Sequence, residues 1–157
     1  MEDTLKIEIK DGRFLITAEQ VVAEMDKRLE KGGYPKISDC KMTADSGTMA
    51  GFGDVTTQAY DLGEGVQLIL YSDVDGNLIQ VFYYVVPSKL TDEGSLYGFC
   101  CGLNFTMFAP DVDFGTLIDK LDIKNLTENT ITSAHSEKSS FTYIVNGDSV
   151  MLSIMAN

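Results

Sequence analysis

The stretch TTQAYDLGEGVQLILYSD at residues 56–73 has a weaker copy, TSAHSEKSSFTYIVNGD, at residues 132–148. A shift of 75 residues places Thr57 on Thr132, Ala59 on Ala134, Ile69 on Ile144 and Asp73 on Asp148. Both stretches have β-favouring residues on each side of a central turn, which is typical of antiparallel strands joined by a hairpin. The chain therefore contains one strand pattern twice.

Two helix-like segments are also related, here by a shift of 74 residues. The matches are Thr17 with Thr91, Glu19 with Glu93, and the apolar trio Val22/Met25/Leu29 with Leu96/Phe99/Leu103. Each half reads as a helix followed by an antiparallel meander. We expect an α+β fold in which two such pseudo-repeats form one curved antiparallel sheet with helices on one face. The single domain spans 1–157, with pseudo-repeats at about 4–86 and about 87–157.

The composition is that of a folded, acidic protein. Of the 157 residues, 44% are hydrophobic and 23% are charged, which argues against wholesale disorder. The formal net charge of −12 disfavours binding to nucleic acid or anionic lipid, because phosphate contacts need Lys and Arg. The charge leaves open a basic partner, mimicry of nucleic acid, or a role in solubility alone.

The sequence is compatible with more than one cellular location. No stretch approaches the roughly 18 apolar residues of a membrane span, and MEDTLKIEIKDG at 1–12 is not a signal peptide. This beginning suits a mature chain released from a tether as well as a cytosolic start. The odd count of cysteines, Cys40, Cys100 and Cys101, argues against a fully paired secreted scaffold, although a bridge from Cys40 to Cys100 or Cys101 stays open.

The first half is predicted to begin with a strand at 4–10 and a turn at Asp11-Gly12. A helix follows, capped by Thr17 with Gln20 and ended by Gly32-Gly33. Residues 44–54 are glycine-rich and read as a mobile loop that carries exposed Met49 and Phe52. Strands are expected at 55–62, 66–72 and 78–86, with tight turns at 62–65 and 72–77.

The second half is predicted to contain a helix from a Thr91 cap through Leu103 and a short helix, FGTLIDKL, after Asp113. Strands near 129–135, 140–146 and 149–155 complete it, and Asn146-Gly147-Asp148 forms the last turn. Cys100 and Cys101 lie in the apolar helical segment, where free cysteine usually acts as a small buried hydrophobe.

Three motifs that suggest chemistry have simpler explanations. DVDGN at 73–77 lacks the Gly and Glu positions of a calcium loop and fits an Asp-rich hairpin turn. His135 is the only histidine, and neighbouring strand residues such as Ser136 point to the opposite face, so an exposed His is favoured over a catalyst. GTMAGFGD at 47–54 lacks the Lys of a phosphate loop, and reads either as a recognition loop or as a poorly ordered one.

The strand LIQVFYYVV at 78–86 is apolar on both faces. A sheet with one wet face normally alternates apolar and polar residues. Either both sides of this strand are covered, or one side is an aromatic surface available to a partner.

The order of elements resembles the tandem-repeat architecture of the β-lactamase inhibitor protein family, in which two repeats form a concave sheet that grips a partner. No diagnostic residue or disulfide of that family has a counterpart here. The phrases DGRFLITAEQVVAEMDKRLEKGG, LGEGVQLILYSDVDGNLIQVFYYV and LTDEGSLYGFCCGL resemble exported, often lipid-anchored domains of Gram-positive gut bacteria. This resemblance implies an extracytoplasmic location, with any membrane attachment through a lipid anchor outside this chain.

These patterns favour a noncatalytic extracytoplasmic binding or protein-interaction module, with no cofactor and no metal. Its partner is expected to be a protein or a small extracellular ligand, not nucleic acid. The predicted contact residues are Met49, Phe52, Tyr71, Phe82, Tyr84 and Tyr143. The alternative is a cytosolic acidic regulator or inhibitor that mimics nucleic acid.

Overall fold

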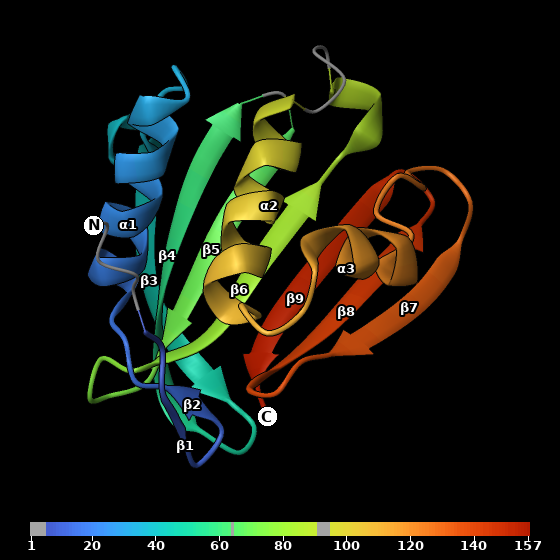
Figure 1. The fold of residues 1–157 in the computed structure, drawn as a ribbon. Helices are drawn as coiled ribbons and strands as arrows, with labels where there is room; N and C mark the ends of the chain where they lie inside the picture. Colours follow the sequence, from blue (N-terminus) through green and yellow to red (C-terminus); the bar gives the residue numbers. More distant parts are fainter. Residues whose placement is uncertain (1–5, 64, 91–94) are drawn as a thin grey trace.

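The computed structural model describes residues 6–63, 65–90 and 95–157. Within them, nine strands form one open antiparallel sheet and three α-helices lie on one of its faces (Figure 1). The helices are α1 (Ala18–Lys31), α2 (Ser95–Phe108) and α3 (Phe114–Leu121), with short 3-10 turns at Ile37–Asp39 and Pro87–Lys89. The strands are β1 (Ile9–Lys10), β2 (Arg13–Phe14), β3 (Lys41–Met49), β4 (Gly53–Gly63), β5 (Val66–Ser72), β6 (Leu78–Val85), β7 (Thr130–His135), β8 (Ser139–Asn146) and β9 (Ser149–Ala156). This is the α+β fold that the sequence predicts.

The two strand meanders meet at the centre of the sheet. The strand order is β3-β4-β5-β6-β9-β8-β7, so the last strand of each half, β6 and β9, pair with each other. Strands β4 and β5 of the first half therefore occupy places equivalent to β7 and β8 of the second. Strand β3 extends the first half outward, whereas α3 is an addition to the second half (Figure 1). The β1–β2 hairpin joins the sheet where Phe14 faces Leu78 of β6.

The helices follow the same 75-residue shift as the strands, which corrects the shift of 74 predicted for them. On α1 the buried side includes Val22, Met25 and Leu29. On α2 the buried residues 75 positions later are Tyr97, Cys100 and Asn104. The 74-residue shift aligned apolar residues of the two helices. Because α2 is apolar on its outward side as well, this alignment placed outward residues of α2 on buried residues of α1 and differed from the true shift by one residue. Thr91 and Glu93, in the predicted cap, lie outside the described residues, as does the side chain of Leu96.

Helix α1 has the ends that its sequence predicts. The side chain of Thr17 accepts a hydrogen bond from the backbone of Gln20, and the side chain of Gln20 accepts one from the backbone of Thr17. This reciprocal pair satisfies two of the amide groups that the first helical turn leaves unpaired. The helix ends at Gly32, and Gly33 follows with φ +78°, a conformation that favours glycine. The short helix α3 is also as predicted, with Asp113 capping the amide of Thr116.

The main core lies between the sheet and the helices. Its largest fully buried side chains include Tyr83, Phe105, Phe141 and Tyr143. Asn104 of α2 is a fully buried polar residue beside them. Its side-chain oxygen accepts a hydrogen bond from the hydroxyl of Tyr83 on β6, which ties α2 to the middle of the sheet. A buried amide needs such a partner, because an unpaired one would destabilise the fold.

Two predicted segments differ from the structure. Residues 44–54 are not a mobile loop, because β3 and β4 pair continuously from Lys41 with Asp61 to Met49 with Gly53, which leaves residues 50–52 as the turn. The glycines at the turn suggested a loop, but Gly51 and Gly53 only supply the positive φ that a tight hairpin needs. The strand predicted at 4–10 is paired only over β1, and its residues 4 and 5 lie outside the described part, as does Glu64 of the 62–65 turn.

Candidate functional site: the open face of the sheet

Within the residues that the structure describes, one face of the sheet carries no helix. All three helices lie on the other side, where they cover alternate residues of each central strand (Figure 1). On β6 the fully buried residues Val81, Tyr83 and Val85 point to the helices. The residues between them, Phe82 and Tyr84, are half-buried and point the other way. Of the two alternatives for this doubly apolar strand, the structure shows that one side is packed and the other is open.

The strand register arranges the outward residues of β5, β6, β9 and β8 in three rows. The first row is Gln67–Tyr84–Met151–Ile144, the second is Ile69–Phe82–Ser153–Thr142, and the third is Tyr71–Gln80–Met155–Ser140. None of these side chains is charged, although the chain as a whole has a net charge of −12. Except for exposed Gln67, all of them are half-buried. We call this surface the open face.

The open face combines apolar area with a few polar groups. Phe82 and Tyr84 lie beside Ile69 and Met151 in their rows, and neighbours across antiparallel strands are about 5 Å apart. The hydroxyl of Tyr84 is 3.0 Å from the Ser149 hydroxyl, so its ring is held at a defined place. Aromatic and methionine side chains with depleted charge are typical of the centres of protein interfaces. This surface can bind through apolar burial and a small number of hydrogen bonds.

Three of the six predicted contact residues meet on the open face. Tyr71, Phe82 and Tyr84 point outward from β5 and β6. The prediction for Tyr143 is wrong, because this residue is fully buried on the helix side of β8. Its hydroxyl donates hydrogen bonds to the carbonyl oxygens of Ile123 and Asn125, and burial raises its pKa. β8 alternates apolar Phe141, Tyr143 and Val145 on one face with Ser140, Thr142 and Ile144 on the other, so its sequence already favours the helix side for Tyr143.

The other two predicted residues, Met49 and Phe52, lie at the tip of the β3–β4 hairpin and outside the three rows. Both are half-buried. The guanidinium of Arg13 lies 4.9 Å from the centre of the Phe52 ring, which ties this tip to the β1–β2 hairpin. Phe52 therefore already has a packing partner within the chain.

Four apolar residues of the open face were missed at the sequence level: Ile69, Ile144, Met151 and Met155. The signal for two of them lies in SVMLSIMA of β9, where Met151 and Met155 alternate with buried Val150, Leu152 and Ile154. A strand that is apolar on both faces indicates, as in β6, that each face contacts something apolar.

The Asp-rich turn at 73–77 is a structural turn, as its sequence indicates. One oxygen of the Asp73 carboxylate accepts hydrogen bonds from the backbone amides of Asp75 and Asn77, both at 2.9 Å. The other accepts one from Arg13 at 2.7 Å. Burial opposes ionisation of Asp73, but these donors outweigh it and lower its pKa. Because donors surround both oxygens, this carboxylate is not arranged to bind a cation.

Catalytic groups do not converge in the described residues. His135 is exposed, and its Nδ1 lies 3.1 Å from the Ser140 hydroxyl, which donates instead to the side chain of Asn157. Burial raises the pKa of Cys100 to about 12, and it raises that of Cys101 further, so both thiols are protonated at neutral pH. All three cysteines are free. Among the described residues, no group of three or more His, Cys, Asp or Glu side chains could hold a metal ion.

A cleft of about 460 Å³ lies between α1, the end of α2 and the segment before β1. Its rim includes Arg28 and Lys138, but both have acidic partners: Arg28 pairs with Glu24 at 3.0 Å and Lys138 with Glu8 at 3.4 Å. The positive charges of these two rim residues are therefore partly offset within the chain. No helix in the described part of the chain is long and apolar enough to cross a membrane.

Comparison of the chain with protein-family models, with curated proteins and with solved structures finds no match. The open face is therefore interpreted from its own geometry and chemistry.

Proposed function

We propose that this chain is a noncatalytic binding module that contacts a protein partner through the open face. The supporting observation is the set of three uncharged rows across β5, β6, β9 and β8, which none of the described helices covers. Folded proteins rarely leave a large contiguous apolar surface without a function. Phe82 and Tyr84 are the central anchors, because they lie on β6 in the middle of the sheet. Tyr71 and Met151 extend the contact to the two neighbouring strands.

A binding role fits the side chains better than catalysis does. The thiols of α2 are buried with raised pKa values, and among the described residues the side chain that His135 contacts in a hydrogen bond is that of Ser140. A general acid–base or nucleophilic reaction needs an activated group held next to its partner. The open face instead offers burial area, which is the main source of affinity in protein interfaces.

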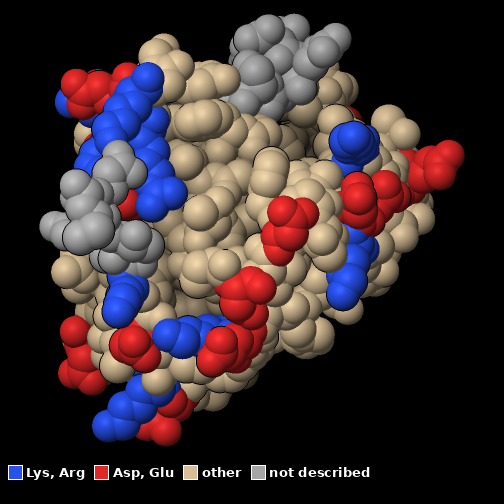
Figure 2. Space-filling model, in the orientation of Figure 1, with Lys and Arg blue, Asp and Glu red and all other residues tan. Residues whose placement is uncertain are grey.

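We place the module outside the cytoplasm, on the resemblance of residues 11–33, 62–85 and 90–103 to exported domains of Gram-positive gut bacteria. The cytosolic alternative, an acidic mimic of nucleic acid, would need carboxylates regularly spaced on one surface. The three rows of the open face contain none. On the helix side, Figure 2 shows acidic and basic residues interspersed around an uncharged centre. The charge pattern therefore supports the binding module more than the mimic.

The proposal is tested by immobilising the wild-type chain and exposing it to the secreted and surface proteins of the cells that make it. The double variant Phe82→Ala/Tyr84→Ala is expected to retain the specific partner at least about 10-fold less, since interface anchors each contribute about 1 kcal/mol or more. Val74→Ala is the matched control, because Val74 is an apolar residue that is 74% exposed but lies in a turn outside the rows.

Far-UV circular dichroism must show that each variant is folded before its binding is compared. If the double variant retains the same proteins as the wild type, the open face is not the binding surface. Val74→Ala should retain the partner like the wild type, and a wild-type chain that retains no protein above the level of an uncoated surface would equally contradict the proposal.

A further inference from the structure

Helix α2 has an outward side that is unusual for a surface helix. None of the residues from Ser95 to Phe108 is charged. The side towards the sheet is buried through Tyr97, Cys100 and Phe105. The opposite side has a shallow groove of about 240 Å³, lined by Gly98, Phe99, Gly102, Leu103, Thr106 and Phe114. A helix that is apolar on all sides is normally covered on all sides.

The groove is shaped by two glycines and an exposed aromatic ring. A side chain at Gly98 would meet nothing within 4 Å, so another backbone can approach α2 closely there. At Gly102, a Cβ atom would lie 3.4 Å from the ring of Phe114. Phe114, the first residue of α3, is 49% exposed. Phe99 is half-buried and stacks on Tyr34 with ring centres 4.5 Å apart, which forms the other wall.

Opposite charges lie on the two flanks of the groove. Lys27, Arg28 and Lys31 follow α1 on one flank, where Figure 2 shows a band of basic residues beside the uncharged surface over α2. Glu24 of the same helix pairs with both Lys27 and Arg28, so one carboxylate offsets part of this charge and basic groups remain in excess on the flank. Exposed Asp111 and Asp113 lie on the other flank, at the start of α3. The groove therefore has a basic border and an acidic border, which is an arrangement that can complement itself.

We propose that a second copy of this chain occupies the groove, with the two α2 helices packed against each other around a two-fold axis roughly parallel to α2. Rotation about this axis exchanges the two flanks, so the basic α1 border of each copy faces the acidic border of the other. An axis across α2 would instead place α1 against α1, with like charges opposed. Such an isologous contact is the commonest form of protein dimer. Both open faces then point away from the interface.

The repeat supplies a matched pair of variants. Position 23 on α1 corresponds to position 98 on α2 through the 75-residue shift, and both residues are exposed. Gly98→Glu places a charge in the groove, whereas Ala23→Glu places the same charge on the charged outer side of α1. Glutamate is a better helix former than glycine, so Gly98→Glu does not weaken α2 itself.

The molar mass is measured by sedimentation velocity on the wild-type chain over a range of micromolar concentrations. We expect a concentration-dependent dimer, weakened at least about 30-fold by Gly98→Glu, because the interface would bury an unpaired charge. Ala23→Glu and Phe82→Ala/Tyr84→Ala should dimerise like the wild type. Lys27→Glu should weaken the dimer by about 3-fold or more, because it removes one attraction between the borders.

A wild-type chain that stays monomeric up to about 100 μM, well above the Kd of a stable dimer, would overturn the proposal. So would a dimer that Gly98→Glu leaves unchanged. If only the Phe82→Ala/Tyr84→Ala variant dissociates, the copies meet through the open face instead. A dimer that is insensitive to Lys27→Glu would overturn the two-fold arrangement along α2.

Discussion

Helices α1 and α2 occupy equivalent places in the two halves of the molecule, yet their outward sides differ completely. On α1, the outward positions hold Ala23, Glu24, Lys27, Arg28 and Lys31. The residues 75 positions later on α2 are Gly98, Phe99, Gly102, Leu103 and Thr106. Every charged residue of this α1 set is thus replaced by an uncharged one on α2. The helix sides that face the sheet are buried in both cases.

This difference shows which constraints the fold itself imposes. An amphipathic helix such as α1 packs its apolar side on the sheet and exposes its polar side to water. The same place in the fold accepts α2, so the sheet does not require an apolar outer side. The sheet therefore does not require the glycines and apolar residues on the outward side of α2, and a second copy is the occupant that we propose for this side.

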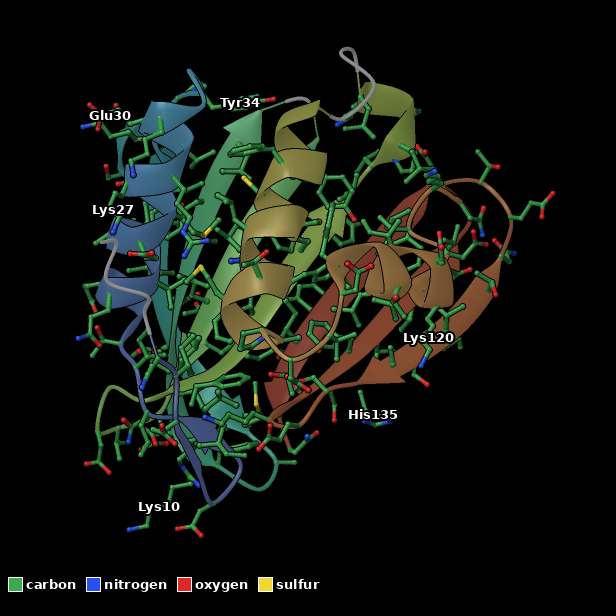
Figure 3. All side chains as sticks on the ribbon, in the orientation of Figure 1. Lys10, Lys27, Glu30, Tyr34, Lys120 and His135 are labelled. Atoms are coloured by element: carbon green, nitrogen blue, oxygen red, sulfur yellow. The ribbon has the colours of Figure 1, made fainter. Side chains whose placement is uncertain are left out.

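The inward sides of the two helices also differ at one position. Leu29 of α1 is matched by Asn104 of α2, which is buried and bonded to Tyr83. Figure 3 shows α2 lying over the centre of the sheet, where side chains from both halves meet. The side-chain amide of Asn104 lies 3.4 Å from the sulfur of Met25, so this residue also links α2 to α1. At this matching position the buried side of α2 is thus more polar than that of α1.

The largest expected effect distinguishes the two sides of α2. Phe105→Ala should lower the free energy of unfolding by about 4 kcal/mol, because Phe105 is fully buried and packs edge-on against Phe141. Phe99→Ala, on the outward side, should cost only about 1 kcal/mol, since it loses little more than the stacking with Tyr34. Urea unfolding followed by far-UV circular dichroism measures both, because the chain has no Trp to report by fluorescence.

The measurement is made at a low protein concentration, at which a dimer would not add stability. Equal losses for the two variants would contradict the assignment of an inward and an outward side to α2.

A smaller effect is expected when α2 is made to resemble α1 at the matching position. Asn104→Leu leaves the Tyr83 hydroxyl buried without its partner and should lower the free energy of unfolding by about 2 kcal/mol. The double variant Tyr83→Phe/Asn104→Leu should recover most of this loss, because replacing both partners by apolar groups is nearly neutral. If Asn104→Leu alone were as stable as the wild type in urea, the hydrogen bond would not be holding α2 to the sheet.

The smallest effect is expected at Asp73 and Asp148, which lie in equivalent turns of the two halves. Asp73→Asn should lower the free energy of unfolding by about 1 kcal/mol at pH 7, because the carboxylate loses its charge towards Arg13. The folded state lowers the pKa of Asp73, so its stabilisation is present above the ordinary value of 3.8 and is lost as the pH falls below it. The difference between Asp73→Asn and the wild type should therefore shrink between pH 5 and pH 2 (approximate limits).

Urea unfolding at several pH values gives this comparison, with Asp148→Asn as the control. Asp148 is exposed and accepts its hydrogen bonds from Ser88, so its replacement should have a smaller effect at pH 7. A larger loss for Asp148→Asn would contradict the view that the Asp73 turn is the more strongly held of the two.

Much of the fold could be predicted from the sequence, because the signals are local. The Thr17 cap, the α3 segment after Asp113 and the strands of both meanders depend on side chains close in sequence. The β3–β4 hairpin was missed because its glycines are common to loops and to tight turns. Only the pairing of β3 with β4 at nine positions shows that this segment is a tight hairpin and not a loop.

The candidate site could be predicted in part. The doubly apolar pattern of β6 indicated an aromatic surface at Phe82 and Tyr84, and both residues lie on the open face. Tyr143 was assigned to the wrong face, although β8 alternates Phe141, Tyr143 and Val145 with the more polar Ser140, Thr142 and Ile144, a local signal that the prediction did not use. The side that the helices cover is set by contacts between residues far apart in the chain.

The sequence by itself determined the repeated helix-and-meander pattern, the ends of α1 and α3, and the turns at 72–77 and 146–148, since these follow from residue type and spacing within a few positions. Only the tertiary structure decided that β6 pairs with β9, which face of the sheet is open, and that α2 turns an uncharged side outward. These features depend on which surfaces meet when the two halves pack together. The physical reason is that burial depends on how the helices and the sheet pack on each other. The sequence of one strand or helix shows only which of its residues share a face, and it does not show what covers that face.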